Sequence, residues 1–545
     1  MGIRKIILVL TGEISSGKST LASKLSEAFG FKVCKTREGL KYFADKELNG
    51  KIPERGFYQE FGEHLDRQGN GRWVLDYFQF LFAKEFNDHH LYIIDSARII
   101  DQIKKIREAY SYFVYHIHLK APPQSLEARF YQRAELQNMP AEKQREKYEE
   151  FKSNETEKQV QTLEAEADLV IDTDRCNALD VFIRVASFFK LLPITTNELV
   201  DVIVGGQFGS EGKGQIAAHI APEYDCLMRV GGPNAGHTVY EEPKKHVFHL
   251  LPSGSYRNPY AKLLIGPGAV LNLNKLLEEV EGFHIEPQRL VIDENATIIR
   301  EEDIAEEQKV KETIGSTGQG VGFATSNNII ARLREDSTHK AKNFKELRPY
   351  IGSTNDELEH MYARNFKILL EGTQGTGLSL YHGLYPHVTS RDTTVAGTLS
   401  EAGISPKRVR KIIMVTRTYP IRVGGKSGPF LSNELTWQIV AERSGKNADE
   451  LNRTEKTTTT KKDRRVAEFS WSLFRKACEL NSPTDIALTF TDYISAQNEK
   501  ARRYDQLTPE TRQLIEEIER CSGVKVSLVG TCFDYRAVID RRNWK

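Results

Sequence analysis

Short apolar runs alternate with amphipathic stretches through the first 190 residues. Ile6–Leu10, Leu91–Ile94, Phe113–Leu119 and Ala167–Ile171 each have the length of a buried strand, and the helix-like run Ser19–Phe29 follows the first of them. Buried strands separated by helices are typical of a parallel sheet that is covered on both faces. We therefore predict a three-layer α/β domain at the amino-terminal end.

The same strand–loop–helix pattern begins again near Val202. Residues 191–199, which read Leu-Leu-Pro-Ile-Thr-Thr-Asn-Glu-Leu, form the join. A chain of 545 residues is too long for one core. The pattern thus predicts a first domain over residues 1–190, a linker over 191–199 and a larger second domain over 200–545.

Composition and charge exclude several classes of protein. The chain has 76 basic and 75 acidic residues, a net charge of +1, which gives no electrostatic basis for binding nucleic acid. It contains no apolar run of about 18 residues, so we expect no membrane span. The apolar start is expected to be a first strand, not a signal peptide. The six cysteines have no zinc-site spacing, which fits a reducing, cytoplasmic location.

The first glycine-rich loop predicts a nucleotide site. It runs from Gly12 through Gly17, Lys18 and Ser19 to Thr20, and matches the pattern G-x-x-x-x-G-K-[ST] between an apolar strand and a helix. The glycines let backbone N–H groups close around phosphate oxygens, and the start of the helix favours negative charge. We expect Lys18 to reach the β- and γ-phosphates and Ser19 to hold Mg²⁺.

The segments around this loop resemble small nucleoside and deoxynucleoside monophosphate kinases. The resemblance rests on the loop, on Asp95-Ser-Ala-Arg98 and on the pair Arg129 and Arg133. It implies that Asp95 lies near the metal, that Arg98 places the acceptor, and that Arg129 and Arg133 clamp the transferring phosphoryl group. Arg37 would hold the acceptor phosphate. Surface salt bridges for single arginines, and a degenerate domain that only binds nucleotide, remain open, as does the acceptor base.

The second glycine-rich loop departs from the first pattern. Gly206 and Gly212 are separated by five residues, Lys213 follows, and Gly214 replaces the Ser or Thr. This run resembles the opening signature of the adenylosuccinate synthetase family, which has an aspartate where Ser210 stands. Further segments resemble the family in the same order along the chain: 231–238, 314–322, 371–376, 385–390, 422–424, 428–430 and 457–465.

That resemblance implies a large, mostly parallel sheet and a defined reaction. The family phosphorylates the 6-oxygen of a purine monophosphate, and the amino group of L-aspartate then displaces the phosphate. His237 would support charge on the oxygen, Lys213 would bind phosphate, and Gln374 would orient the 6-oxygen. The Gly236 carbonyl and Ser210 would lie at Mg²⁺. Gly209, Gly212 and Gly214 would bind the nucleoside triphosphate.

The resemblance also implies the residues that bind the substrates. Asn234, Thr317, Thr389 and Arg422 would contact the purine monophosphate, and Arg332 would reach its 5′-phosphate from a second subunit, which implies a homodimer. Aspartate would be bound by Thr460, Lys462 and Arg464. Lys462 stands where an arginine is usual, and lysine lacks the bidentate fork. Taken alone, this basic run is equally typical of a solvated face.

Ser210 is the most informative departure, because the family's aspartate is described as the base for the purine N1 proton. A serine hydroxyl is no base at neutral pH. The enzyme is then inactive, or uses IMP by another proton route, or takes a different substrate. Because serine leaves space for a 2-amino group, we favour the last. The loop resembles phage-type 2-aminoadenylosuccinate synthetases, which join aspartate to dGMP.

The second departure concerns the phosphoryl donor. Phe490 stands where the family has a lysine that reads GTP, while Asp492 persists and Thr531 begins the altered final motif. An aromatic ring stacks on any base without reading its edges. ATP or dATP is thus favoured over GTP. The alternatives to a dGMP-dependent ligase remain an ordinary IMP-dependent synthetase and a non-catalytic nucleotide-sensing protein.

Overall fold

The computed structural model divides the chain into two compact units, residues 1–194 and 195–545. It describes residues 5–48, 57–83, 88–133, 136–137, 139–153, 155–192, 197–241, 243–314, 317–334, 337–457 and 462–542. Each unit is described by itself. Within these ranges no helix is long and apolar enough to cross a membrane.

Unit 1 is built on a five-stranded sheet in the order β2-β3-β1-β4-β5, with every neighbouring pair parallel. Its strands are β1 Ile6–Thr11, β2 Lys32–Lys35, β3 Leu91–Asp95, β4 Val114–Lys120 and β5 Leu169–Asp172. Its helices are α1 Lys18–Phe29, α2 Thr36–Leu48, α3 Phe57–Gly69, α4 Arg72–Phe82, α5 Ile100–Tyr110, α6 Pro123–Tyr131, α7 Ala141–Ser153, α8 Glu155–Thr162 and α9 Ala178–Phe188.

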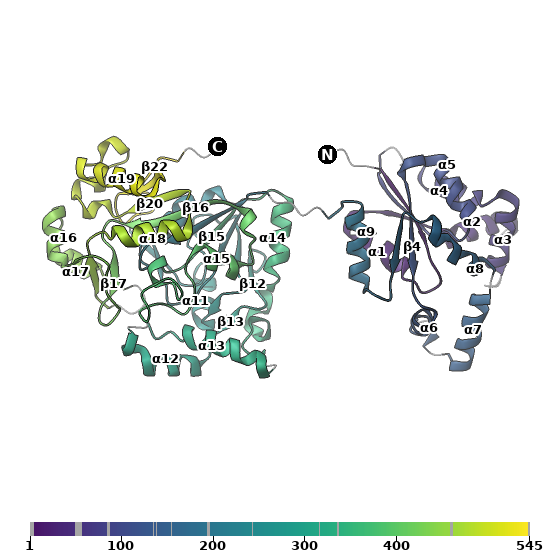
Figure 1. Ribbon diagram of the computed structural model, residues 1–545, viewed down its shortest axis with the longest axis horizontal. Helices are drawn as coiled ribbons and strands as arrows, with labels where there is room; N and C mark the ends of the chain where they lie inside the picture. The colour runs from purple at the N-terminus through teal and green to yellow at the C-terminus, as the bar shows by residue number, and fades with distance from the viewer. Residues whose placement is uncertain are drawn as a thin grey trace. The chain divides into compact units, whose positions relative to one another are not determined.

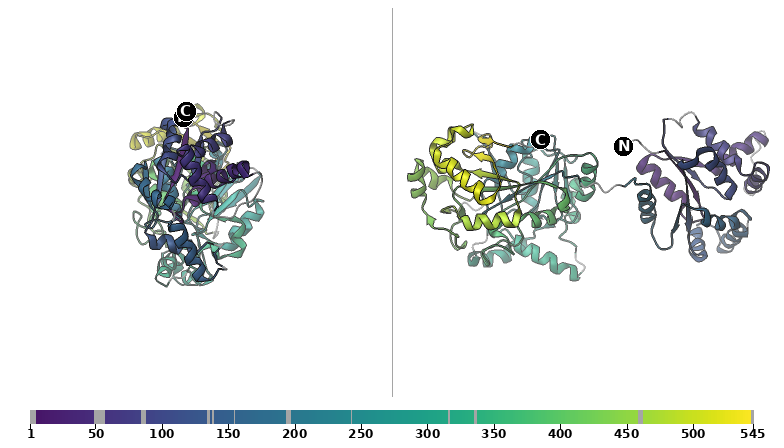
Figure 2. Two further views of the ribbon diagram at one scale, coloured as in Figure 1. Left: turned by 90° about the vertical axis from the view of Figure 1, so that its right-hand side faces the viewer. Right: turned by 45° about the horizontal axis from the view of Figure 1, so that its top comes forward.

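The alternation of side chains along β1 divides the core of unit 1 between the two faces of its sheet. Ile6, Leu8 and Leu10 pack with residues of α1 and α9, whereas Ile7 and Val9 pack with residues of α4 and α5. Side chains of a strand point to opposite faces in turn, so a strand buried on both faces is apolar throughout. Helices lie on both sides of this sheet (Figures 1 and 2), and the predicted three-layer α/β fold is confirmed.

Unit 2 contains a ten-stranded sheet in the order β14-β12-β10-β7-β15-β6-β16-β20-β21-β22. All neighbouring pairs are parallel except β21 with β22. The strands are β6 Val200–Gly205, β7 Cys226–Arg229, β10 Lys262–Ile265, β12 Leu290–Asp293, β14 Ile351–Gly352, β15 Ile368–Glu371, β16 Val409–Arg417, β20 Asp485–Thr489, β21 Val526–Gly530 and β22 Val538–Asp540. The large, mostly parallel sheet is thus confirmed.

Smaller sheets lie beside this one, and helices cover it. The smaller sheets pair β8 His237–Glu241 with β9 Lys244–Phe248, β11 Val270–Leu271 with β13 Thr297–Ile298, and β19 Arg464–Ala467 with β17 Ile421–Val423 and β18 Glu434–Leu435. The helices are α10 Lys213–Ile220, α11 Leu273–Gly282, α12 Glu301–Ile314, α13 Val321–Ala331, α14 Thr354–Ala363, α15 Val395–Ala402, α16 Trp437–Ser444, α17 Ala448–Thr454, α18 Trp471–Asn481 and α19 Pro509–Ser522.

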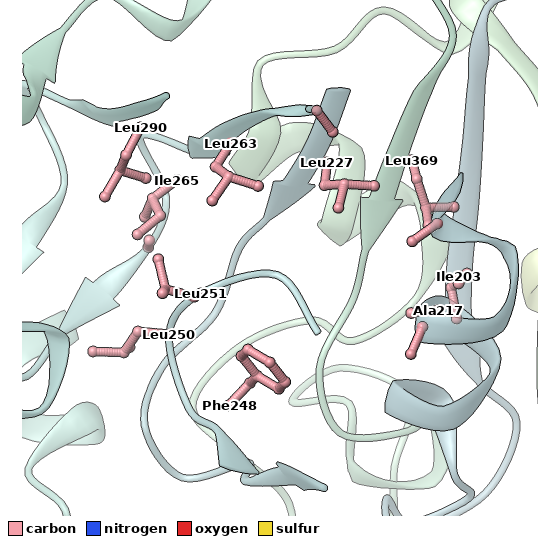
Figure 3. Close-up of a cluster of buried hydrophobic side chains, with 14 of the residues drawn as sticks. Ile203, Ala217, Leu227, Phe248, Leu250, Leu251, Leu263, Ile265, Leu290 and Leu369 are labelled. Atoms are coloured by element: carbon pink, nitrogen blue, oxygen red, sulfur yellow. The ribbon is translucent and has the colours of Figure 1, made fainter. Parts of the chain in front are cut away.

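Two apolar clusters fill the faces of the large sheet. One joins Ile203, Leu227 and Leu369 of three neighbouring strands to Ala217 of α10 and Phe248 of β9 (Figure 3). The other packs the opposite side chains of the same strands against α14, α15, α18 and α19. Both glycine-rich loops follow strands in the interior of a sheet, β1 and β6. Ligands of open α/β sheets bind beyond the carboxyl ends of such strands.

Candidate active sites

The loop between β6 and α10 is folded around a buried carboxylate. Glu211 accepts hydrogen bonds from the backbone N–H groups of Gln207 at 3.1 Å and Gly209 at 2.8 Å, and it bonds Lys213 Nζ at 2.7 Å. Lys213 also donates to the Gln374 carbonyl. Gly212 has a φ of +90° at the cap of α10, where a larger residue would be strained. Lys213 is therefore held in place by Glu211 of its own loop and by the backbone at Gln374.

This loop forms one wall of a cavity of 520 Å³ in unit 2. Other walls come from the turn before β8, from α13, from the segment that follows β15, and from β17 and β19. The predicted site residues that line it are Gly209, Ser210, Gly212, Lys213, Gly214, Asn234, Gly236, His237, Thr317, Gln374, Thr389, Arg422 and Arg464. The predicted residues that line this cavity thus lie up to 255 positions apart in the chain, from Gly209 to Arg464.

His237 is positioned by a buried carboxylate behind it. Its Nδ1 lies 2.6 Å from Glu371 Oε1 and 3.2 Å from Ser253 Oγ. Burial, reinforced by the Arg229 cation, lowers the pKa of His237 to about 4, so the ring is neutral at pH 7. Burial alone would raise the pKa of Glu371, but Arg229 and His237 outweigh it and hold that pKa at about 2. A neutral ring that donates from Nδ1 keeps Nε2 as an acceptor.

Hydrogen bonds between cavity residues pre-orient the wall on which the monophosphate is expected. Thr317 donates to Asn234 Oδ1 at 2.9 Å, and Gln374 donates through Nε2 to Thr389 Oγ1 at 2.7 Å. Arg422 donates to the His387 carbonyl at 3.0 Å. Burial, and then the nearby Arg465, lower the pKa of Arg422 to about 10, so it remains a cation. The cavity therefore offers amide, hydroxyl and guanidinium groups suited to a nucleotide phosphate and base.

Ser210 belongs to a network centred on a second buried carboxylate, Glu455. The Ser210 hydroxyl accepts from Arg464 at 3.4 Å, and Arg464 donates to Glu455 at 2.9 Å. Arg417 donates to Glu455 at 3.0 Å and to the Ser210 carbonyl at 3.3 Å. Tyr493 donates to the same carboxylate at 2.6 Å. Arg464, predicted to bind aspartate, is thereby tied to the loop that carries Ser210.

Several predicted residues lie outside the cavity lining. Arg332 and Lys462 are exposed. Asp492 is buried, its Oδ2 is 2.8 Å from Lys446 Nζ, and burial raises its pKa to about 6. Thr531 is buried and bonds backbone carbonyls. Thr460 lies outside the described residues. The roles of these five residues stay predictions.

The first glycine-rich loop opens into a cavity of 1140 Å³ in unit 1. The predicted residues that line it are Gly17, Lys18, Ser19, Thr20, Arg37, Asp95, Arg98, Arg129 and Arg133. Gly12 lies at the base of the loop, where a side-chain carbon would come within 2.1 Å of the Leu119 carbonyl oxygen. A glycine is thus required there because β4 approaches the loop so closely.

Polar contacts arrange the groups around this loop. Lys18 Nζ donates to the carbonyls of Gly12 and Glu13 at 2.7 and 2.8 Å, and burial together with nearby Arg98 lowers its pKa to about 7. Ser19 donates to Asp95 Oδ2 at 2.9 Å, which pairs a hydroxyl with a carboxylate. These are hard oxygen ligands of the kind that Mg²⁺ prefers.

The predicted arginines of unit 1 each have a contact on the cavity wall. Arg129 bonds the hydroxyl and the carbonyl of Thr173, both at 2.8 Å. Arg133 donates to Ser15 at 3.1 Å, and Arg98 forms an ion pair with Glu157. Arg129 also lies 4.0 Å from Asp174 Oδ1, as part of an ion pair.

Both cavities offer oxygen donors that could take part in binding Mg²⁺. Among the described residues, no group of three or more His, Cys, Asp or Glu side chains is arranged to hold a metal ion. Mg²⁺ usually takes one or two protein oxygens together with substrate phosphates and water. Ser19 with Asp95 in unit 1, and Ser210 with the Gly236 carbonyl in unit 2, are the oxygen donors that fit it.

The carboxylates behind the cavity were not singled out in the sequence. Glu371 begins the segment that contains Gln374, and Glu455 lies two residues before the first threonine of the Thr-rich run. Their positions beside these motifs were the one feature of the sequence that could have indicated their roles. Arg229, Ser253 and Arg417 have no comparable signal, because their roles arise only from long-range packing.

Comparisons with known proteins agree with this geometry. The family model for adenylosuccinate synthetase matches residues 202–335 and 331–499. The adenylosuccinate synthetase of Methanocaldococcus jannaschii is 38% identical over 354 residues, which cover 63% of this chain and 96% of the relative. That of Thermococcus onnurineus is 35% identical over 353 residues, covering 63% and 98%.

Two solved structures resemble unit 2. Fully ligated adenylosuccinate synthetase from Plasmodium falciparum has a TM-score of 0.55 and 24% identity, and the match covers 64% of this chain and all of that one. The cyanophage S-2L succinoaminodeoxyadenylate synthetase, bound to dGMP and to dATP as an energy donor, has a TM-score of 0.52 and 27% identity, covering 64% and 96%.

The fold and the cavity of unit 2 are those of a ligase that acts on nucleotides. The chain belongs to the adenylosuccinate synthetase family.

Proposed function

We propose that unit 2 joins L-aspartate to carbon 6 of dGMP, driven by a nucleoside triphosphate, and yields 2-amino-deoxyadenylosuccinate, a nucleoside diphosphate and phosphate. The observation that carries this proposal is the neutral Ser210 hydroxyl on the cavity wall. Among the described residues, Glu307 is the one acidic side chain on that wall, and it accepts the Gly322 N–H at 3.2 Å. At position 210 the cavity wall therefore carries a neutral side chain, where the family has a carboxylate.

The hydroxyl distinguishes purines at their N1 and C2 edge. Guanine carries a 2-amino group beside N1–H, whereas hypoxanthine carries a hydrogen at carbon 2. Serine is smaller than aspartate, and its oxygen can accept from the 2-amino group. A buried hydrogen bond of this kind favours its own substrate strongly over one that lacks the donor. The cyanophage synthetase bound to dGMP supports this choice.

The reaction has two bond-forming steps. The purine 6-oxygen forms a bond to the γ-phosphorus, the bond to the β-phosphate breaks, and the N1 proton leaves to a phosphate oxygen or water. The aspartate nitrogen then forms a bond to carbon 6, the 6-phosphate departs with its electron pair, and the nitrogen loses a proton. Nε2 of His237, an acceptor in the neutral ring, donates to the reacting oxygen once the ring takes up a proton, and Gln374 orients that oxygen. When bound, Mg²⁺ supplies charge neutralisation.

An aromatic stack beside the loop supports ATP or dATP as donor. The Phe490 and Phe533 rings are stacked with centroids 5.8 Å apart, and Tyr240 stacks on Phe533 at 6.2 Å. Both phenylalanines line the cavity next to Gly212 and Lys213. Asp492 pairs with Lys446 through Oδ2 and could still accept from an amino group, which guanine and adenine both carry. An aromatic ring that stacks on a base without contacting its edges can bind adenine.

A substrate panel tests the ligase. We expect aspartate-dependent phosphate release with dGMP at least 10-fold faster than with IMP, and Ser210→Asp should move the preference toward IMP. Turnover with IMP and none with dGMP or GMP would instead identify an ordinary IMP-dependent synthetase. Nucleotide binding without any aspartate-dependent release, unchanged by His237→Ala, would favour a sensing protein.

Unit 1 is proposed to be a (deoxy)nucleoside monophosphate kinase. The supporting observation is that its P-loop, Asp95 and four arginines line one cavity. Phosphoryl transfer needs little beyond positioning and charge neutralisation, and this wall supplies both. The formation of a nucleoside diphosphate without aspartate, abolished by Lys18→Ala, tests it.

A homodimer is also proposed. Arg332 is exposed next to Ile329, Ile330 and Leu333, whose side chains are 55%, 43% and 77% exposed. Apolar side chains gathered around a cation on a surface are typical of an interface. Light scattering after size exclusion is expected to give twice the chain mass, and a monomer would refute the dimer.

A further inference from the structure

The wall of the unit 1 cavity divides into two groups of residues, according to the strands that they follow. The phosphate loop follows β1, with β3 and β2 on one side of it and β4 and β5 on the other. The β4 and β5 side contributes the neutral residues Cys176, Asn177 and Ala178 together with three cations, Arg129, Arg133 and Lys147. The β2 and β3 side contributes three cations, Lys35, Arg37 and Arg98.

The roles proposed for the cations place the acceptor. A donor triphosphate has its phosphates on the loop, whereas an acceptor monophosphate brings a further phosphate that needs cations of its own. Arg129 and Arg133 are assigned to the phosphoryl group in transfer, so Lys35, Arg37 and Arg98 are left for the acceptor's phosphate, and their side is the acceptor side. Its wall is completed by α3, α4 and the first turn of α5, through Asp66, Trp73 and Gln102.

Asp66 is a carboxylate held in place by neutral donors. Trp73 donates through Nε1 to its Oδ1 at 2.6 Å, and Gln102 donates to Oδ1 at 2.9 Å and to Oδ2 at 3.2 Å. The Gln102 carbonyl accepts the backbone N–H of Arg98 at 2.8 Å, which fixes the orientation of the amide. Gln102 is buried and Trp73 nearly so. The carboxylate is thus pre-oriented on the cavity wall, and burial raises its pKa.

We propose that Asp66 accepts from the Watson–Crick edge of a guanine, so that unit 1 phosphorylates guanosine or deoxyguanosine monophosphate. This inference rests on the proposed kinase function. An ionised carboxylate only accepts hydrogen bonds. Guanine presents two adjacent donors, N1–H and the 2-amino group. Adenine and cytosine each present an acceptor nitrogen there, and thymine flanks its one N–H with two carbonyls.

The proposed phosphoryl transfer needs no general base. An oxygen of the acceptor's phosphate, a dianion near neutral pH, forms a bond to the γ-phosphorus of the triphosphate, while the bond to the β-phosphate oxygen breaks. The nucleoside diphosphate leaves with that electron pair, and the product is a guanosine or deoxyguanosine diphosphate. Asp66 touches only the base, so it sets specificity and takes no part in the bond changes.

The test uses the full chain with ATP and Mg²⁺ and without aspartate, and it measures nucleoside diphosphates by chromatography. The acceptors are dGMP, GMP, dAMP, dCMP, dTMP and the deoxymonophosphate of 2-aminoadenine. We expect kcat/KM for dGMP or GMP to exceed that for each other base at least 10-fold. Asp66→Asn should lower the value for guanine nucleotides about 10- to 100-fold, as expected for a lost bond to a charged group.

The matched control is Glu63→Gln, a neighbouring acid of α3 that lines the same cavity. It should leave the preference unchanged. If Asp66 were purely structural, Asp66→Asn would lower kcat/KM for all acceptors equally, or would lower the thermal midpoint. Either result would refute this inference. A wild-type preference for another base also refutes it, yet leaves the kinase standing. No diphosphate from any acceptor overturns both proposals.

Discussion

At the scale of single residues, two carboxylates behind the cavity of unit 2 fix the side chains on its wall. Glu371 holds His237, and Glu455 holds Arg464 and Arg417. A buried charge is tolerated only where partners compensate its lost hydration. Both carboxylates have such partners, so removal of either should disturb a cation or an imidazole that faces substrate.

Glu455→Gln is expected to cost both stability and aspartate binding. Burial would raise the pKa of Glu455, but Arg417 and Arg464 lower it to about 2 from the ordinary 4.5. A carboxyl whose pKa is lowered in the folded state stabilises the protein at pH values above its pKa in the unfolded state. That contribution is about 3 kcal/mol at pH 7 and is lost as the pH falls from 4.5 toward 2. Urea unfolding of unit 2 should show this difference at pH 7 and a smaller one at pH 3.5.

The aspartate KM of the same variant should rise about 10-fold, because Arg464 loses its fixed position. Glu434→Gln is the matched control, since Glu434 pairs with the adjacent Arg465 but is half exposed. Exposed pairs contribute at most about 1 kcal/mol. Equal effects of the two substitutions would contradict the special role of Glu455.

At the scale of elements, the loops that follow β20 and β21 bring aromatic rings to the phosphate loop. Phe490 has a φ of +58°, a left-handed conformation in which a bulky residue is uncommon. Its ring lies under the Arg417 guanidinium, 4.0 Å from the centroid, and against Phe533. Conformational strain at Phe490 is thus accompanied by contacts that place a flat apolar surface beside Gly212.

Phe533→Ala should weaken the binding of every nucleoside triphosphate to unit 2. Phe533 is 39% exposed on the cavity wall, and stacking on a base contributes about 1 to 3 kcal/mol. We expect the KM for ATP, dATP and GTP to rise together, about 10-fold, with little change in kcat. Tyr260→Ala, at a tyrosine that is 95% exposed outside the cavity lining, is the control. A rise for one triphosphate alone would show that this ring reads base edges.

The elements also show what the sequence could predict. The alternation of apolar runs predicted β1, β3, β4 and β5 within one or two residues, because buried parallel strands are continuous in sequence. The glycine-rich loops predicted both cavities, since glycine patterns reflect local backbone needs. Asp66 was not predicted, because nothing in its neighbourhood shows that Gln102, 36 residues away, would fix it.

The same limit applies to the network around Ser210. Its hydroxyl meets Arg464, which is 254 residues further along the chain. Family resemblance could propose that both residues belong to one site, but only the fold shows that Glu455 and Arg417 connect them. Contacts of this kind arise from the order of strands in the sheet, which one sequence does not reveal.

At the scale of the whole molecule, the two units carry separate phosphate loops, each with its own lysine and its own cavity. Lys18 and Lys213 are both held by carbonyl oxygens of nearby backbone. Each cavity is lined by residues of one unit alone. Because phosphoryl transfer depends on groups in contact with the nucleotide, the two proposed activities should be separable by single substitutions.

Lys18→Ala should therefore lower the diphosphate formation that occurs without aspartate at least 100-fold, and leave aspartate-dependent phosphate release within about 2-fold of the unaltered chain. His237→Ala should do the reverse, because its ring lines the cavity of unit 2, where it bonds Ser253 and Glu371. The two rates are measured on the same preparations, so a folding defect would appear as a joint loss. If either substitution lowered both rates with the thermal midpoints unchanged, the two cavities would be coupled, and the chain would act as one catalytic unit.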